Sequence, residues 1–170
     1  DVTFTNCTSE GNSLYGFYAT NGGKLYNCVD KDVGAGKTDY TYRKPASYYS
    51  IPCRSTNPSL VMENCTSIDS HGYGLQVDLA SNVQIQNFHL ENPAGIDGKG
   101  ASLGGTNGQF GDSSVDITAS GDRVDTLVFA KNNQNVQYTG EITSDSARAF
   151  LVEGGQNVQT AGMKVVPAGQ

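Results

Sequence analysis

The sequence contains no tryptophan, and only 16% of its 170 residues are charged. It has no uninterrupted run of about 18 apolar residues, so no membrane-spanning helix is expected. No long stretch shows apolar residues at helical spacing, which predicts that helix is scarce. The four cysteines include no Cys-x-x-Cys pair, so a zinc site of that kind is not indicated. These absences favour an all-β chain.

Glycine and small polar residues are abundant instead, with 21 glycines in the chain. Such residues are typical of proteins with many tight turns. The length suits a single domain with a sizeable core. The chain begins at Asp1, already inside a repeat and without an initiator methionine or a signal peptide. We therefore expect a fragment of a longer repeat protein.

A short alternating pattern recurs along the chain. Its clearest copy spans residues 81–90, where a turn is followed by alternating apolar and polar residues. Measured from the first apolar residue of each copy, the spacings are 23, 35, 23, 32, 21 and 22 residues. A period in the low twenties that carries short strands is the signature of a solenoid. The sequence therefore predicts an all-β parallel β-helix of about seven rungs, each of 21–23 residues.

The two long spacings predict two loop insertions in one domain spanning residues 1–170. The first insertion is expected at 31–58 and the second extension at 91–111. The apolar residues of the repeats are expected to point inward from parallel strands. They include Val83, Ile85, Val115, Ile117, Val136 and Tyr138.

Asparagines recur at one phase of the repeat. A short amide at a sharp bend can bond backbone groups in its own rung and the next. This predicts a stacked and buried asparagine column, formed by Asn6, Asn27, Asn64 and Asn87. Asn6 and Asn64 also match the Asn-x-Thr glycosylation pattern, but the expected burial argues against modification.

Three of the four cysteines follow these asparagines directly, at Cys7, Cys28 and Cys65. Stacked interior cysteine behaves as a small apolar residue, which favours a column of reduced thiols. A disulfide between Cys7 and Cys28 is a second interpretation, because adjacent strands lie within bridging range. The cysteines therefore do not decide the redox compartment.

Rungs of this length, with Asn at the turn and openings such as Asn82-Val83-Gln84-Ile85, resemble the right-handed parallel β-helix proteins of the pectin-lyase-like superfamily. That group comprises polysaccharide lyases, polygalacturonase-like hydrolases, epimerases and phage tailspikes. The resemblance implies a right-handed coil and an extracellular, virion-surface or cell-surface location. It also implies a polysaccharide as the partner.

One segment is similar to polygalacturonases in particular. Residues 69–75, Asp-Ser-His-Gly-Tyr-Gly-Leu, are followed by Asn-Val-Gln-Ile-Gln-Asn at 82–87, like the G-H-G and N-V-x-I-x-N motifs of that family. Ser70 replaces the first glycine, and only Lys99 matches the later R-I-K motif that binds the sugar carboxylate. The family's catalytic N-T-D and D-D motifs have no match in residues 1–70. The resemblance therefore covers architecture better than catalysis.

The segment 31–54 contains five of the eleven basic residues and carries a net charge of +3, whereas the rest of the chain carries −9. Tyrosine and arginine together stack on sugars and pair with carboxylates. The sequence thus predicts a basic, tyrosine-lined groove beside rungs two to four. Its candidate substrate-binding residues are Arg43, Lys44, Tyr40, Tyr42, Tyr48 and Tyr49. The alternative interpretation is that these tyrosines only hold a long loop against the coil.

Two function classes follow. The first is an extracellular protein that binds or cleaves an anionic, uronate-containing polysaccharide. A lyase needs a base near the sugar C5 proton and a cation at the carboxylate. His71, Tyr73 and Lys99 are the catalytic candidates, and Asp69 and Asp97 are further candidates for a metal or an acid role. No cofactor is expected, with Ca²⁺ as the alternative.

The second class is a non-catalytic structural or adhesive rod, such as a tailspike, fibre or surface-protein segment. Its partners would be further β-helix rungs or two more copies in a homotrimer. Nucleic acid is disfavoured as a partner by the sequence pI of about 4.7. A membrane is not expected as a partner either.

Overall fold

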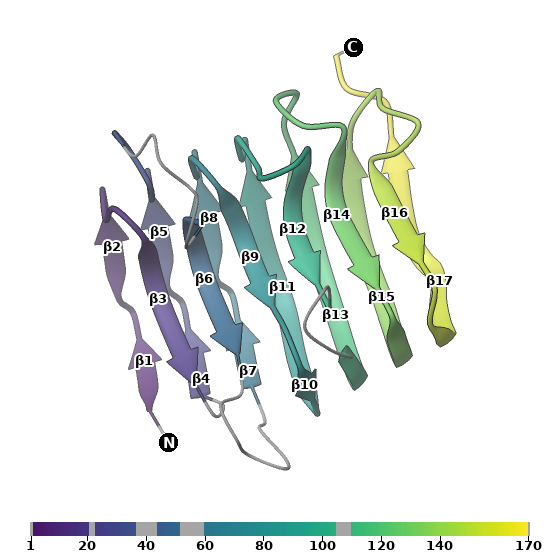
Figure 1. The fold of residues 1–170 in the computed structure, drawn as a ribbon, viewed down its shortest axis with the longest axis horizontal. Helices are drawn as coiled ribbons and strands as arrows, with labels where there is room; N and C mark the ends of the chain where they lie inside the picture. Colours follow the sequence, from purple (N-terminus) through teal and green to yellow (C-terminus); the bar gives the residue numbers. More distant parts are fainter. Residues whose placement is uncertain (1, 21–22, 37–43, 52–59, 105–109, 170) are drawn as a thin grey trace.

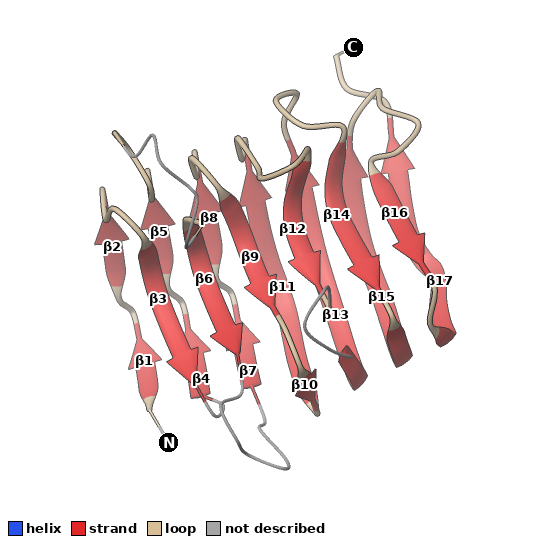
Figure 2. Ribbon diagram, viewed as in Figure 1, coloured by secondary structure: helices blue, strands red, loops and turns tan. Residues whose placement is uncertain are grey.

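The computed structural model describes residues 2–20, 23–36, 44–51, 60–104 and 110–169. These residues form a parallel β-solenoid of about six turns, built only from strands and loops in the described part of the chain (Figures 1 and 2). The strands lie in two layers that face each other across a shared core. The all-β parallel solenoid predicted from the period of the sequence is confirmed.

The first sheet contains one long path of strands and a set of short ones. The path is β1 (Thr3–Thr5), β4 (Gly23–Tyr26), β7 (Leu60–Glu63), β11 (Val83–Glu91), β13 (Phe110–Ser120), β15 (Asn133–Thr143) and β17 (Gln156–Val166). The short strands are β2 (Thr8–Glu10), β5 (Val29–Lys31), β8 (Thr66–Ile68) and β10 (Ala80–Ser81).

The second sheet contains one strand from each turn. Its strands are β3 (Tyr15–Thr20), β6 (Ala46–Ile51), β9 (Tyr73–Val77), β12 (Lys99–Leu103), β14 (Thr126–Lys131) and β16 (Phe150–Glu153). Neighbouring strands in both sheets pair in parallel, as in the β11–β13 and β9–β12 pairs. Each rung therefore places its residues directly above the matching residues of the previous rung.

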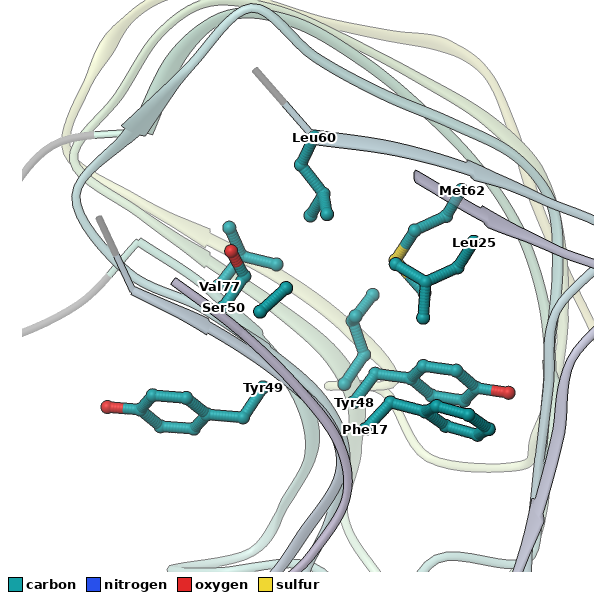
Figure 3. Close-up of a pocket in the computed structure, with 10 residues that line it drawn as sticks. Phe17, Leu25, Tyr48, Tyr49, Ser50, Leu60, Met62 and Val77 are labelled. Carbon is teal, nitrogen blue, oxygen red and sulfur yellow. The ribbon is translucent and has the colours of Figure 1, made fainter. Parts of the chain in front are cut away.

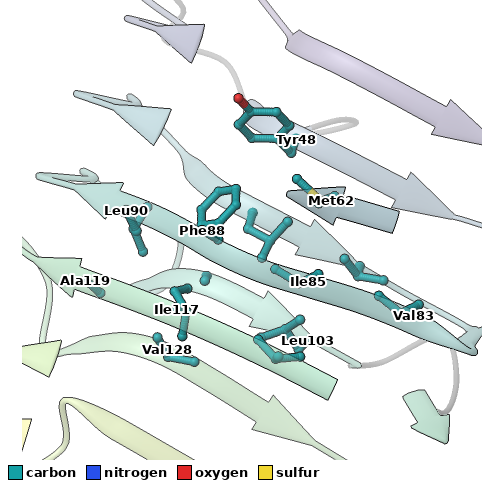
Figure 4. Close-up of a cluster of buried hydrophobic side chains, with 14 of the residues drawn as sticks. Tyr48, Met62, Val83, Ile85, Phe88, Leu90, Leu103, Ile117, Ala119 and Val128 are labelled. Carbon is teal, nitrogen blue, oxygen red and sulfur yellow. The ribbon is translucent and has the colours of Figure 1, made fainter. Parts of the chain in front are cut away.

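The core is a stack of inward-facing apolar side chains from both sheets (Figure 4). All six residues predicted to point inward are buried, which confirms the alternation read from the sequence. A small pocket lined by residues that include Phe17, Leu25 and Met62 has a volume of only about 10 Å³ (Figure 3). That is roughly the room that a single water needs.

Each of the two predicted insertions contains a strand of the coil. The strand β6 lies inside the predicted 31–58 insertion, and β12 lies inside the predicted 91–111 extension. Each of them pairs with β9 in the second sheet, so both belong to the coil.

The asparagine column is present as a hydrogen-bonded ladder. The Nδ2 of Asn27 donates to Oδ1 of Asn6 at 3.1 Å, that of Asn64 to Asn27 at 3.2 Å, and that of Asn87 to Asn64 at 2.8 Å. The predicted burial is wrong, because all four side chains are exposed. Their φ angles of 52–55° turn the chain so that the following residue, such as Cys28 or Phe88, points inward instead. Burial therefore gives no argument against glycosylation at Asn6 or Asn64.

Replacement of Asn64 with alanine is expected to lower the free energy of unfolding by about 2 kcal/mol, since alanine loses two ladder hydrogen bonds and is strained at positive φ. Asn64→Gly removes the same hydrogen bonds but tolerates the backbone conformation, so it is expected to lose less. Urea denaturation of both variants measures the difference. Equal losses in the two variants would mean that the left-handed backbone contributes nothing.

The predicted cysteine column is also present. Cys7, Cys28 and Cys65 carry free thiols, and the last two are buried. The Sγ of Cys65 donates to the carbonyl oxygen of Leu25 at 3.5 Å, which links successive rungs. Burial raises the pKa of Cys65 to about 11. Cys53 lies outside the described residues. The three described thiols therefore act as small core side chains.

Candidate functional site

Three tyrosines form a contiguous group on the outer face of the second sheet, here called the tyrosine platform: Tyr15, Tyr18 and Tyr49. The rings of Tyr18 and Tyr49 stack with centroids 5.3 Å apart and an interplanar angle of 12°. Tyr15 lies 5.1 Å from Tyr18 and 4.8 Å from Tyr49. Tyr18 is 45% exposed. The platform therefore presents stacked aromatic surface to solvent.

The register of β3 and β6 explains this stack. Tyr18 pairs with Tyr49, and the preceding residues Phe17 and Tyr48 also pair. Because side chains alternate along a strand, Phe17 and Tyr48 point into the core while Tyr18 and Tyr49 point away from it. Figure 3 shows Tyr49 on the opposite side of its strand from Phe17 and Tyr48.

Gly16 brings Tyr15 to the same face as Tyr18. Residues three apart in a regular strand lie on opposite faces, so an irregularity is required between them. A side chain at Gly16 would collide with the buried carboxylate of Asp30, which shows that this position faces the interior together with its neighbour Phe17. Two consecutive inward positions therefore leave Tyr15 and Tyr18 both outside.

Tyr48 was predicted to bind substrate, but it lies in the core. It is only 3% exposed, and its ring stacks on Phe17 at 5.2 Å. Its hydroxyl lies 2.9 Å from the carbonyl oxygens of both Cys28 and Thr66, which share its single proton. Burial raises the pKa of Tyr48 far above its ordinary value. Tyr48 is thus a core residue and cannot contact a substrate.

Tyr40, Tyr42 and Arg43 were predicted to bind substrate as well, and they lie outside the described residues. Of the predicted substrate-binding set, Tyr49 and Lys44 are described on the outer surface. The exposed Tyr18 and the nearby Tyr15 were not among the predicted substrate-binding residues, because the sequence alone does not reveal the irregularity at Gly16.

Several residues that were predicted from the sequence to form a site also lie beside the platform. Tyr73 packs with Ala46 and Ile96 in a small cluster that Tyr15 and Tyr49 contact. Lys44 Nζ lies 3.3 Å from Oδ2 of Asp97. The backbone of Lys99 pairs with that of Ile96, and Lys99 Nζ lies 4.6 Å from the centroid of the Phe129 ring. Lys44, Tyr73, Asp97 and Lys99 therefore border one outer surface.

Tyr73 is poorly suited to act as a base. It is almost buried, and burial, followed by the charges of Asp97 and Asp78, raises its pKa to about 12. A general base works best with a pKa near the operating pH. Tyr73 therefore keeps its proton at neutral pH.

His71 and Asp69 lie in the turn before β9. The Nε2 of His71 lies 4.0 Å from Oδ1 of Asp32, and Oδ1 of Asp69 accepts a hydrogen bond from Asn92 at 2.8 Å. Within the described ranges, no three His, Cys, Asp or Glu residues are grouped to hold a metal ion. The roles of these two residues remain sequence-based predictions.

Comparison of the chain with protein-family models, with curated proteins and with solved structures found no match. None of the described residues forms a helix long and apolar enough to cross a membrane. Function is therefore inferred from the side chains of the solenoid itself.

Proposed function

We propose that this protein binds a uronate-containing polysaccharide by stacking sugar rings on the tyrosine platform. The observation that carries the proposal is the register-matched stack of Tyr18 on Tyr49, with Tyr15 beside it and Tyr18 45% exposed. Tyrosine supplies a large, rigid and amphipathic contact surface at low conformational-entropy cost. Tyr15 and Tyr49 also pack against the cluster of Ala46, Tyr73 and Ile96, whereas Tyr18 is the exposed ring of the platform.

Lysines at the edge of this surface support an anionic ligand. Lys44 pairs with Asp97, but both side chains are well exposed. Exposed ion pairs contribute little, typically less than about 1 kcal/mol, so Lys44 can exchange Asp97 for a sugar carboxylate. Lys99 Nζ lies over the ring of Phe129 on β14, further along the sheet from the platform strands β3 and β6. Lys44 would meet a charged chain next to the tyrosines and Lys99 would meet it further along, while the tyrosines would provide contact area.

The resemblance to pectin-lyase-like β-helix proteins supports the proposal, since stacked asparagines and parallel rungs occur in this chain. It favours an extracellular location or one at a virion or cell surface. Burial holds Tyr73 protonated, so we propose that it does not abstract a proton and that binding is the function of this surface. The alternative is a structural rod, in which the platform has no ligand.

Replacement of Tyr18 with alanine is expected to weaken binding of oligogalacturonate by about tenfold, equivalent to about 1.4 kcal/mol. The change removes an exposed ring, so the melting temperature is expected to fall little. Isothermal titration calorimetry measures the affinity.

The matched control is Tyr26→Ala, which removes a partly exposed tyrosine from β4 on the other sheet. It is expected to leave the affinity unchanged. Absence of oligogalacturonate binding by the wild-type protein, or equal losses in both variants, would favour the rod instead.

A further inference from the structure

A polar groove of about 360 Å³ crosses β11, β13, β15 and β17 on the first sheet. Two parallel files of side chains border it. The first file consists of the side chains at left-handed turns, which precede these strands or lie within them. The second file consists of the side chains two residues later on each strand. The groove is therefore repeated from rung to rung and belongs to a different sheet from the tyrosine platform.

The first file is held in place by its own hydrogen bonds. The Nδ2 of Asn135 donates to Oδ1 of Asp112 at 3.1 Å, and that of Asn157 donates to Oδ1 of Asn135 at 2.9 Å. Their φ angles of 50–58° fix the backbone beneath them. Each amide has a second N–H that the ladder does not use. This file therefore offers ordered donors at a regular spacing.

The second file consists of side chains that the fold does not require. Gln84, Ser114, Gln137 and Gln159 lie in register on neighbouring strands, and all are exposed. In the described part of the chain their side chains have no hydrogen-bond partner.

The tripeptide Asn-Val-Gln occurs at 82–84, 135–137 and 157–159. Its asparagine adopts the left-handed turn, and its valine points inward. Turn and core packing therefore account for the asparagine and the valine. They do not account for the glutamine, which lines the groove in all three copies.

We propose that this groove binds a linear, uncharged glycan that runs along the solenoid axis. Amide groups both donate and accept hydrogen bonds, as sugar hydroxyls do. Asp112 is the single ionisable side chain among the residues that line the groove, so no cation recruits a carboxylate there. Strands about 4.8 Å apart present the same groups to successive sugar units. The volume falls within the roughly 300–1,000 Å³ typical of ligand sites.

The test uses the ¹⁵N-labelled chain titrated with cellohexaose, mannohexaose and xylohexaose. At least one of these is expected to shift the side-chain amide signals of Gln84, Gln137 and Gln159. Gln137→Ala is expected to weaken that binding at least fivefold with an unchanged melting temperature. The matched control, Gln86→Ala, removes an exposed glutamine of β11 that does not line the groove, and it should bind as the wild type does.

Tyr18→Ala is also expected to bind the neutral glycan normally, which separates this site from the tyrosine platform. The proposal is overturned if none of the three hexasaccharides shifts these amide signals. It is equally overturned if Gln86→Ala loses as much affinity as Gln137→Ala, or if oligogalacturonate binds the groove as tightly as the neutral glycan.

Discussion

Asp30→Asn is expected to stabilise the fold by about 2 kcal/mol at pH 7.5 and to change stability little at pH 4. Asp30 is 0% exposed, and in the described part of the chain neither of its carboxylate oxygens has a hydrogen-bond partner. Burial raises its pKa to about 6, and the nearby hydroxyls of Ser47 and Ser9 offset only part of this effect. An uncharged side chain of the same shape avoids the desolvation of a carboxylate.

The direction of this pH effect on stability follows from the proton binding of Asp30 in the folded and unfolded states. An aspartate in the unfolded chain has a pKa of about 3.9. The folded state holds the Asp30 proton more tightly, so this residue's contribution is most favourable below about pH 4 and is lost as the pH rises through about 6. A shift of about two units corresponds to about 3 kcal/mol, from which the imperfect hydrogen bonding of a buried asparagine subtracts.

Urea denaturation at pH 4 and pH 7.5 measures this effect, with Asp122→Asn as an exposed control. Burial also raises the pKa of Asp78 to about 6, so Asp30→Asn should keep part of the wild-type pH dependence. An Asp30→Asn protein no more stable than the wild type at pH 7.5 would contradict an unpaired carboxylate inside the coil. So would a large stabilisation by Asp122→Asn.

Ile85→Asp is expected to destabilise the fold by about 4 kcal/mol or more, because it places an unpaired charge in the core. Ile85 is 2% exposed and pairs in register with Met62 on one side and Val115 on the other. No rung can move away from the charge without separating its neighbours. The variant should therefore melt far below the wild type, as measured by circular dichroism.

The matched control is Gln84→Asp, which introduces the same charge at the exposed neighbouring position. It is expected to change the melting temperature by only a few degrees. If the two variants melted alike, the assignment of inward and outward faces in β11 would be wrong.

The fold could be predicted from the sequence because each rung repeats the same alternation. Val83 and Ile85 needed only their period-two spacing to be placed in the core. The stacked asparagines were predictable for the same reason. Their exposure was not, because spacing does not tell on which side of a bend the side chain lies. The positive φ at Asn64 decides that side.

The candidate site was less predictable. Tyr48 and Tyr49 are adjacent, and only the register of β6 shows that the first is buried and the second lies outside. The strand β6 lies in a long rung where the repeat period is interrupted, and the interrupted period predicted a loop there. Tyr15 and Tyr18 share a face only because Gly16 occupies an inward position beside Asp30. Such a local irregularity leaves no trace in the apolar pattern.

Nuclear magnetic resonance of the tyrosine rings tests the polysaccharide-binding proposal most directly. In a titration with oligogalacturonate, the ring signals of Tyr18 and Tyr49 are predicted to shift together, with saturation passing from these rings to the sugar protons. The ring of Tyr26, on the other sheet, is predicted to stay unchanged. Ring signals of Tyr18 and Tyr49 that do not respond to saturating oligogalacturonate would contradict the proposal.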